Sequence, residues 1–390
     1  MTNAASDALS RCTSLLADLV AFPTVSGGST GPILDYVTEY LAGHGITPSF
    51  SWDETGERAN LLARIGPEAP GGVVLNGHTD VVPVAGQNWS RDPFTLHEED
   101  GRLYGRGALD MKGFLACALA MVPDFAAAEL KKPIWIALSY DEETGSKGAP
   151  VLAQHLIDEN VAPEAIIVGE PTEMKILGGQ KGGFEAQSTF LGAACHSSDP
   201  RNGVNAIAYA ARFITFLTDL ATEIAANPQD GPFNPPYNTI NIGVIHGGAA
   251  GNVVAADCVV EWELRKTPPN DGRDHLARIM DELARIDTEM KAAGEGCGVT
   301  TEMLGEYEGM AYDPANPAIS LAQALSGENA VSTAPFGTDA TAFSARDLPA
   351  VIFGPGSIAQ AHKPDEYIEI KALERCLDVL GKLAERQSHG

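Results

Sequence analysis

The sequence predicts an α/β domain whose sheet is at least partly parallel, interrupted by a smaller α+β domain. Three observations support this prediction. The chain has 390 residues, which is more than one ordinary hydrophobic core accommodates. Short apolar runs alternate with segments of helical periodicity up to about residue 180 and again after about residue 307. Between these points the apolar residues alternate with polar ones, as in strands that have one exposed face.

The two outer segments of the chain, residues 1–181 and 307–390, are expected to form the α/β domain. Several of their apolar runs lack polar alternation, which is typical of strands buried on both faces. The expected strands cover residues 60–65, 72–75, 134–139, 165–168 and 351–353. The expected helices cover residues 7–21, 31–44, 111–125, 148–159 and 370–385. Alternating strands and helices favour a sheet in which at least some neighbouring strands are parallel.

The middle segment, residues 182–306, is expected to form a separate, inserted domain. The expected strands cover residues 184–190, 238–244 and 257–264. The expected helices cover residues 204–220 and 273–292. This order of elements is typical of a split-βαβ fold. The glycine-rich stretch Gly178–Gly183 fits no nucleotide-binding motif and is interpreted as the hinge between the domains.

The charge balance excludes some classes of partner. The chain has 52 acidic and 26 basic residues, and its formal net charge is −26. A phosphate backbone would be repelled, so no nucleic-acid partner is expected. An acidic surface could attract a cationic substrate, although a high negative charge also serves solubility alone.

Further features of the sequence predict a cytoplasmic protein without a membrane anchor. No run of 18 apolar residues is present, so no membrane-spanning helix is expected. The N-terminus lacks the basic region and apolar stretch of a signal peptide. The six cysteines show no Cys-x-x-Cys spacing and are interpreted as buried thiols of a reducing compartment.

Histidine and acidic residues recur after the apolar runs of the α/β domain. The set consists of His78, Asp80, Asp110, Glu142, Glu143, Glu170 and His362. Each residue alone has a simpler explanation, because Glu is mostly exposed, a His is often a surface or core residue, and Asp110 could cap the following helix. Ligands bind beyond the carboxyl ends of parallel strands, so recurrence at five such places predicts a functional site.

The residue types in this set suit a hydrolytic metal centre. Imidazole and carboxylate ligands without a thiolate are typical of catalytic rather than structural zinc. Two histidines and three acidic residues are enough for two metals if one carboxylate bridges them. One further carboxylate must stay free of metal to act as a general base. Asp80, two residues after His78, could bond to the other imidazole nitrogen.

These motifs together resemble the M20 family of metallopeptidases and deacylases. The motifs are His78-x-Asp80, Gly105-Arg106-Gly107-x-x-Asp110-Met111-Lys112-Gly113, Asp141-Glu142-Glu143, Gly169-Glu170-Pro171-Thr172 and His362. The resemblance extends from about residue 10 to residue 385, and residues 236–243 and 354–367 are most similar to the acetylornithine deacetylases. It implies a zinc-dependent exopeptidase-like catalytic domain, with a mixed sheet flanked by helices, and an inserted ferredoxin-like domain for dimerisation and closure.

The resemblance also implies a role for each residue of the set. His78, Asp110 and Glu170 would hold one zinc ion. Glu143 and His362 would hold a second zinc ion, which Asp110 bridges to the first. Glu142 would be the base that activates water, and Asp80 would orient His78. Cobalt or manganese could replace zinc at such sites. The Asp110–Met111 peptide bond would be cis.

Three residues of the inserted domain are assigned by the resemblance alone. In a homodimer, His196 would reach the active site of the partner subunit and stabilise the oxyanion there. Asn252 and Arg265 would bind the carboxylate of the substrate. Arg265 has a simpler alternative role in a salt bridge at a strand edge, because arginines are commonly exposed.

The expected activity is the metal-dependent removal of an acyl group, preferably acetyl, from a small amino acid. The expected substrate is N2-acetyl-L-ornithine, and the expected products are L-ornithine and acetate. Related alternatives are a succinyl-diaminopimelate desuccinylase, another N-acyl-amino-acid deacylase and a dipeptidase. A non-catalytic binding protein is disfavoured because binding alone needs no base such as Glu142. A dehydrogenase is disfavoured because the glycine fingerprint for a dinucleotide is missing.

Overall fold

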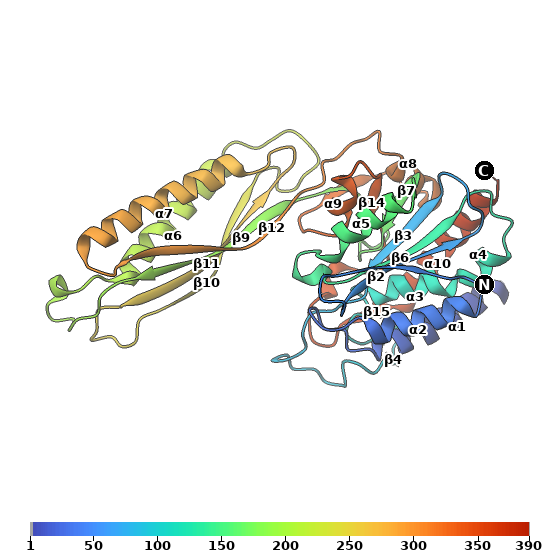
Figure 1. Ribbon diagram of the computed structural model, residues 1–390, viewed down its shortest axis with the longest axis horizontal. Coiled ribbons are helices and arrows are strands. Elements are labelled where there is room, and N and C mark those ends of the chain that lie inside the picture. Colours follow the sequence, from blue (N-terminus) through green and yellow to red (C-terminus); the bar gives the residue numbers. More distant parts are fainter. Residues whose placement is uncertain (1–2, 390) are drawn as a thin grey trace. The chain divides into compact units, whose positions relative to one another are not determined.

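The computed structural model describes residues 3–389, and the chain folds as two compact units (Figure 1). The first unit runs up to Gly179 and also contains Asp313–Ser332 and the chain from Thr338 onward. The second unit consists of Gln180–Tyr312 and Thr333–Gly337. The segment expected to form the inserted domain, residues 182–306, lies within the second unit.

The main sheet of the first unit has eight strands in the order β1-β2-β6-β3-β7-β14-β8-β13. Their bounds are β1 Ser49–Trp52, β2 Ala59–Ile65, β3 Val73–His78, β6 Ile134–Ser139, β7 Ala165–Val168, β8 Ile176–Gln180, β13 Val331–Ala334 and β14 Ala350–Ile352. The central strands β6, β3, β7 and β14 are parallel. Strands β1 and β2 pair antiparallel with their neighbours and β8 pairs antiparallel with β14, so the sheet is mixed.

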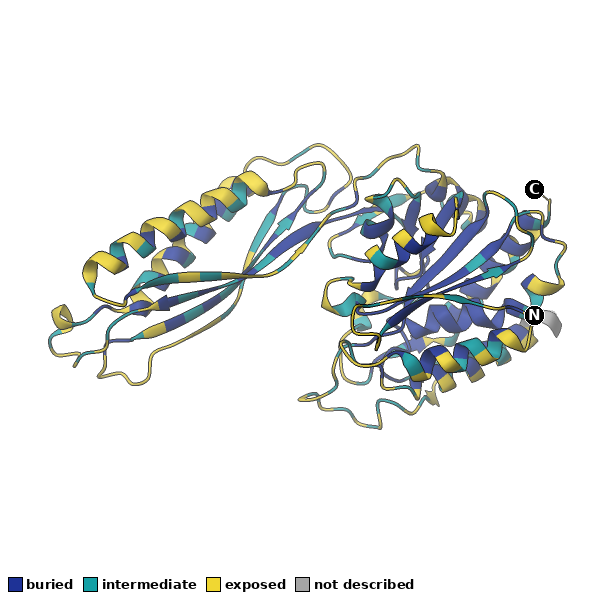
Figure 2. Ribbon diagram, viewed as in Figure 1, coloured by how far each residue is buried: buried dark blue, intermediate teal, exposed yellow. Residues whose placement is uncertain are grey.

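Helices cover both faces of this sheet (Figure 1). On one face α1 (Asn3–Val20), α3 (Lys112–Ala120) and α10 (Ile370–His389) pack together. On the other face α5 (Gly148–Asp158) packs against α9 (Ala340–Ser344). Strands β3 and β7 are buried along their whole length, as Figure 2 shows, which explains why their apolar runs lack polar alternation.

The remaining elements of the first unit are short. Three strands form a separate small sheet, with bounds β4 His97–Glu99, β5 Arg102–Tyr104 and β15 Tyr367–Glu369. The other helices are α2 Gly31–Ala42, α4 Val122–Ala127 and α8 Pro317–Ser326. The single helix expected over 111–125 is wrong, because α3 ends at Ala120 and α4 starts at Val122. Pro123 explains the break, since proline lacks the N–H of a helix interior but fits a first turn.

The second unit is a four-stranded antiparallel sheet in the order β10-β11-β9-β12, accompanied by two helices. The bounds are β9 Gly182–Leu191, α6 Ala206–Ala225, β10 Thr239–Gly247, β11 Asp257–Lys266, α7 Arg273–Ala293 and β12 Gly298–Tyr307. The alternating burial of β9 and β11 places their apolar side chains on the face that α6 and α7 cover. Strand β12, which was not expected from the sequence, completes the β-α-β-β-α-β order.

The predicted fold class is confirmed, because a mixed α/β domain and a separate α+β domain are both present.

The core of the second unit is centred on Phe213 of α6, whose ring lies 5.9 Å from that of Phe190 and 6.0 Å from that of Trp262. These rings join the helix to β9 and β11.

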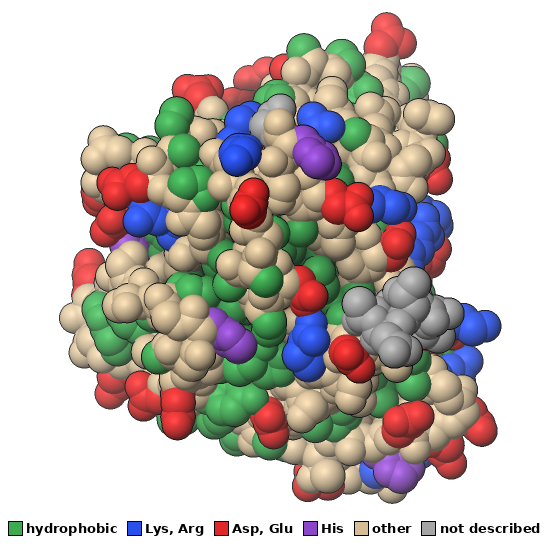
Figure 3. All heavy atoms as spheres, turned by 90° about the vertical axis from the view of Figure 1, so that its right-hand side faces the viewer, with side chains coloured by type: hydrophobic (Ala, Val, Ile, Leu, Met, Phe, Trp, Pro, Cys, Tyr) green, Lys and Arg blue, Asp and Glu red, His purple; other side chains and the backbone are tan. Residues whose placement is uncertain are grey.

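The surface of the molecule reflects the high negative charge of the sequence. Figure 3 shows acidic side chains spread over one face and interspersed with Lys and Arg. Between residues 3 and 389, no helix combines the length and apolar character needed to cross a lipid bilayer.

Candidate metal centre

Three of the predicted site residues lie at one edge of the main sheet of the first unit. His78 is the last residue of β3, and Glu170 lies two residues after β7. Glu142 begins the 3-10 turn η1 (Glu142–Thr144), which follows β6. Because β3 lies between β6 and β7 and runs parallel to both, the carboxyl ends of these strands bring the residues together.

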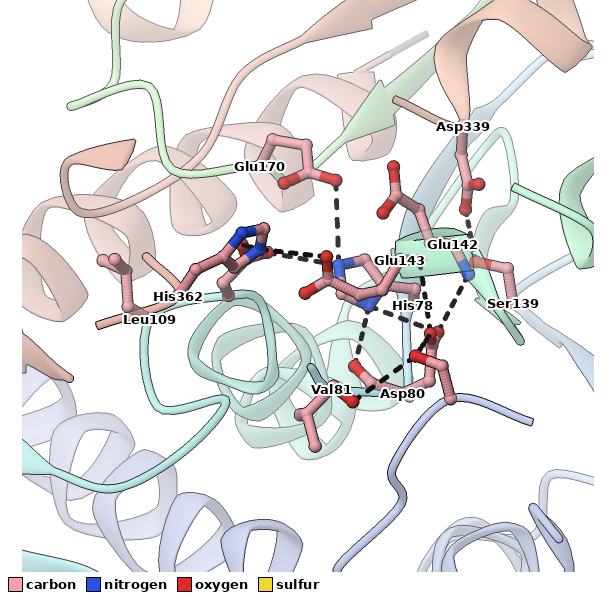
Figure 4. Close-up of polar contacts among 12 residues, drawn as sticks. His78, Asp80, Val81, Leu109, Ser139, Glu142, Glu143, Glu170, Asp339 and His362 are labelled. Carbon is pink, nitrogen blue, oxygen red and sulfur yellow. Dashed lines mark hydrogen bonds and ion pairs between the residues drawn. The ribbon is translucent and has the colours of Figure 1, made fainter. Parts of the chain in front are cut away.

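A first group of possible metal ligands consists of His78, Asp110 and Glu170. One ligand atom from each lies within 4.8 Å of the others, and all three side chains are buried. The Nε2 atom of His78 lies 3.2 Å from Asp110 Oδ1. It lies 3.8 Å from Glu170 Oε1 (Figure 4).

A second group consists of Asp110, Glu143 and His362. The Nε2 atom of His362 lies 3.3 Å from Asp110 Oδ2 and 2.9 Å from Glu143 Oε2 (Figure 4). Asp110 therefore belongs to both groups and turns a different carboxylate oxygen to each. The side chain of His362 is 54% exposed, so this group is open to solvent whereas the first is enclosed.

The electrostatics of the site indicate an excess of negative charge. Burial and the charge of Glu170 raise the pKa of Glu142 well above its usual range. Burial and the charge of Asp110 raise the pKa of Glu170 in the same way. Burial opposes ionisation of Asp110 too, but hydrogen bonds with His362 and His78 hold its pKa well below the usual range. Crowded carboxylates of this kind would be stabilised by bound cations, and imidazole with carboxylate is a ligand set that zinc accepts.

Asp80 anchors the turn that carries the two adjacent glutamates. Its Oδ1 accepts the backbone N–H of Glu142 at 3.0 Å, and its Oδ2 accepts that of Glu143 at 3.3 Å. The hydroxyl of Ser26 also donates to Oδ2, at 2.6 Å. His78 Nδ1 lies 2.9 Å from the backbone carbonyl oxygen of Asp80 and 3.4 Å from its carboxylate. Asp80 thus contacts His78 mainly through its backbone, and its carboxylate mainly orients Glu142 and Glu143.

The residue before the turn, Asp141, adopts a left-handed conformation with φ of 52°. Its Oδ1 accepts the backbone N–H of Gly27 at 2.7 Å, and its Oδ2 accepts Arg58 Nη1 at 2.6 Å. Aspartate tolerates this backbone better than most residues, and here two partners distant in sequence hold it. Sequence reasoning missed these partners because no local pattern marks them.

The Asp110–Met111 peptide bond is cis, as the resemblance implied. Met111 directly precedes α3, so Asp110 stands at the entry to a helix that is buried on all sides.

The other three predicted site residues lie in the second unit. His196 is exposed, its Nδ1 lies 2.8 Å from the hydroxyl oxygen of Ser198, and its backbone forms a bridge with Val253. Asn252 precedes Val253, so the fold brings His196 and Asn252 close together. Arg265 lies in β11 and forms a salt bridge of 2.6 Å with Glu263, which is the simpler role considered for it.

The sequence of the chain identifies its family. Residues 74–386 match peptidase family M20/M25/M40. The chain belongs to this family. It is therefore an M20 metallohydrolase, and its buried His, Asp and Glu side chains form the candidate metal centre of such an enzyme.

Similar proteins cover almost the whole chain. An acetylornithine deacetylase from Proteus mirabilis is 34% identical over 379 residues, which is 95% of each chain. An acetylornithine deacetylase from Myxococcus xanthus is 35% identical over 389 residues, which is 97% of each chain. The crystal structure of a tripeptidase from Staphylococcus aureus superposes with a TM-score of 0.76 over 98% of this chain and 99% of that chain. It is only 20% identical, so it supports the fold alone.

Asp339 is a buried acidic residue near the centre that sequence reasoning missed (Figure 4). Its Oδ2 accepts a hydrogen bond of 2.5 Å from the hydroxyl of Ser139, the last residue of β6. Burial raises the pKa of Asp339 to about 6. The folded protein therefore retains a proton that the unfolded chain releases near pH 4. The contribution of Asp339 to stability is largest below pH 4 and is lost as the pH rises through about 6.

We expect Asp339→Asn to become more stable relative to the wild type as the pH rises from 5 to 8. The amide stays neutral, so the variant lacks the cost of ionising a buried carboxyl group. The measurement is the free energy of unfolding by urea at both pH values, in the presence of a chelator. As a control, Asp219→Asn changes an exposed carboxylate on α6 and should leave the pH dependence unaltered. Equal pH dependence of Asp339→Asn and the wild type would contradict the prediction.

Proposed function

We propose that this protein removes the acetyl group from N2-acetyl-L-ornithine and releases L-ornithine and acetate. The amide-hydrolysing chemistry rests on one observation, namely two candidate ligand groups that share Asp110, with Glu142 beside His78 and Glu170. The choice of substrate rests on relatives about one-third identical over nearly the whole chain, which are named acetylornithine deacetylases.

The ligand groups fit two zinc-class ions. His78, Asp110 and Glu170 would hold one ion, and Glu143 and His362 would hold the other together with Asp110. Bound metal would supply a water of pKa about 7 and polarise the substrate carbonyl. Nitrogen and oxygen ligands of this kind also accept cobalt and manganese.

Glu142 is proposed as the group that carries the proton. It belongs to neither ligand group, so its carboxylate is free to accept a proton from water and return it to the leaving amine. Burial and the neighbouring Glu170 raise the pKa of Glu142, which moves it toward the range of an efficient general base. Asp80 keeps the turn in place by accepting the N–H of Glu142 at 3.0 Å.

The second unit is proposed to bind substrate and to dimerise. In this proposal His196 stabilises the oxyanion in the partner's active site, and Asn252 and Arg265 bind the substrate carboxylate. His196 is exposed and therefore accessible to a partner chain. A two-fold symmetric dimer would place both copies of His196 equivalently.

Among candidate substrates, N2-acetyl-L-ornithine should have the highest kcat/KM. The comparison set is N-succinyl-diaminopimelate, N-formyl and N-acetyl derivatives of neutral amino acids, and unmodified dipeptides. A difference of at least about 10-fold is expected, since small changes in substrate are discriminated by roughly 10- to 200-fold. Amine release by zinc-loaded protein is the measurement, and chelated protein is the control. If a dipeptide or the succinyl derivative were the best substrate, the choice of acetylornithine would be refuted. The assignment as a metallohydrolase would still hold.

Replacing Glu142 by Gln should lower kcat by roughly 10²- to 10⁴-fold, because the amide cannot carry the proton. The metal content should stay near that of the wild type. Glu143→Gln is the matched control and should instead lose metal, because Glu143 lies 2.9 Å from His362 in a ligand group. Metal analysis and steady-state kinetics on both variants give the answer, and the opposite pattern would mean that the two roles are exchanged.

Mixing two inactive variants tests the role of His196 in the partner's site. His196→Ala and Glu142→Gln homodimers should each be inactive, but exchange of subunits should restore part of the activity. The mixed dimer would hold one site with an intact Glu142 and an intact His196 from the partner. Exchange is verified with differently tagged chains. Proven exchange without recovered activity, or a fully active monomer, would reject the proposal.

A further inference from the structure

A buried carboxylate holds the backbone of the shared ligand Asp110. Glu366 Oε1 accepts the N–H groups of Leu109 at 3.0 Å and of Asp110 at 3.1 Å. Its Oε2 accepts a hydrogen bond of 2.6 Å from Arg106 Nη1, and the side chains of Glu366 and Arg106 are each 1% exposed. The carboxylate of Glu366 is therefore fully enclosed and aims at the chain segment that presents Asp110.

The same arginine connects this segment to the loop that carries His362. Arg106 Nη2 donates to Gln87 Oε1 at 2.5 Å, and its guanidinium lies 5.0 Å from the ring centre of Trp89. Trp89 Nε1 donates to the same Gln87 oxygen at 3.0 Å. The amide nitrogen of Gln87 then donates to the backbone carbonyl of His362 at 3.0 Å. A single chain of hydrogen bonds thus runs from Asp110 through Glu366, Arg106 and Gln87 to His362.

His362 is supported less firmly by the fold than the candidate ligands that lie near strand ends. His362 follows a short 3-10 turn (Ile358–Gln360) and has a left-handed backbone with φ of 63°, so neither a strand nor a helix supports it. Its side chain is 54% exposed, so packing does little to fix its position. In contrast, His78 ends a buried strand and Glu170 closely follows another.

We propose that Gln87 is the positioning residue for His362 and controls the affinity of one of the two metal positions. This inference rests on the metal ligands assigned in the proposed function. Gln87 contacts His362 directly, but it reaches Asp110 only through Arg106 and Glu366. Loss of its amide N–H therefore affects mainly the position formed by Asp110, Glu143 and His362. Glu366 positions the ligand common to both groups, so its loss weakens both positions.

Cobalt binding to chelated full-length protein tests the two positions separately. His78→Ala leaves only the Asp110, Glu143 and His362 position, and His362→Ala leaves only the His78, Asp110 and Glu170 position. Adding Gln87→Met to His78→Ala should raise the Kd for Co²⁺ roughly 10- to 100-fold, the usual effect of losing a group that orients a ligand. In the His362→Ala background the same change should alter the Kd by less than about threefold, because the side-chain hydrogen bonds of Gln87 go to His362, Trp89 and Arg106 and not to a remaining ligand.

Three further variants exclude indirect effects. Gln87→Glu keeps an oxygen for Arg106 but replaces the donor to His362 by a charged acceptor, so it should reproduce the selective loss even if Gln87→Met folds poorly. Glu366→Gln should raise the Kd at both positions. Gln154→Met, an exposed glutamine of α5 that bonds to Asp158, should change neither. Circular dichroism and thermal unfolding verify that each variant is folded.

Two results would overturn the inference. If Gln87→Met and Gln87→Glu change the Kd equally at both positions, or at neither, Gln87 does not position His362, whereas the proposed ligands stand. If neither single-position protein binds Co²⁺, the ligand assignment falls and the inference falls with it. The measurement contains no substrate, so a wrong choice of acetylornithine leaves its outcome unaffected.

Discussion

The carboxylate of Asp110 is the group on which the rest of the candidate centre depends. Its Oδ1 lies 3.2 Å from His78 Nε2, and its Oδ2 lies 3.3 Å from His362 Nε2. Neither ligand group can form without it, so the backbone that carries Asp110 has to be held in one place. Glu366 holds it through two backbone N–H groups, and the pairing with Arg106 makes the burial of Glu366 tolerable. The candidate centre therefore depends on Asp110, and the position of Asp110 depends on the buried side chain of Glu366.

Candidate ligands near strand ends and candidate ligands in loops are held by different contacts. The hydrogen bonds of the sheet fix the backbone of His78, and those of β7 end close to Glu170. Asp110 and His362 lie in loops and are fixed by side chains from other parts of the chain. A ladder bond belongs to the sheet itself, whereas the bond from Gln87 to His362 joins two loops outside the sheet. Side-chain hydrogen bonds rather than strand ladders therefore hold the two candidate ligands that lie in loops.

This difference also decides how much the sequence could predict. His78 and Glu170 follow recognisable apolar runs, so their place near strand ends could be predicted, and the recurrence of such residues at five places selected them. Gln87 and His362 are 275 positions apart, and only the folded chain brings them together. Gln, Glu and Asp are commonly exposed, so no local signal distinguished Gln87, Glu366 or Asp339 from surface residues. The break between α3 and α4 could have been predicted from the sequence, because Pro123 stands in the first turn of α4.

Three cations of the first unit already have hydrogen-bond partners, which affects whether they could bind a substrate carboxylate. Arg58 pairs with two aspartates, Arg106 bonds to Glu366 and Gln87, and the ammonium of Lys112 donates to two backbone carbonyls at 2.8 and 3.0 Å. Diverting any of them to a substrate carboxylate would leave a buried partner unsatisfied, at a cost of about 1–3 kcal/mol or more. This cost disfavours Arg58, Arg106 and Lys112 as partners of a substrate carboxylate, so their role in this structure is to hold the backbone and side chains around the candidate centre.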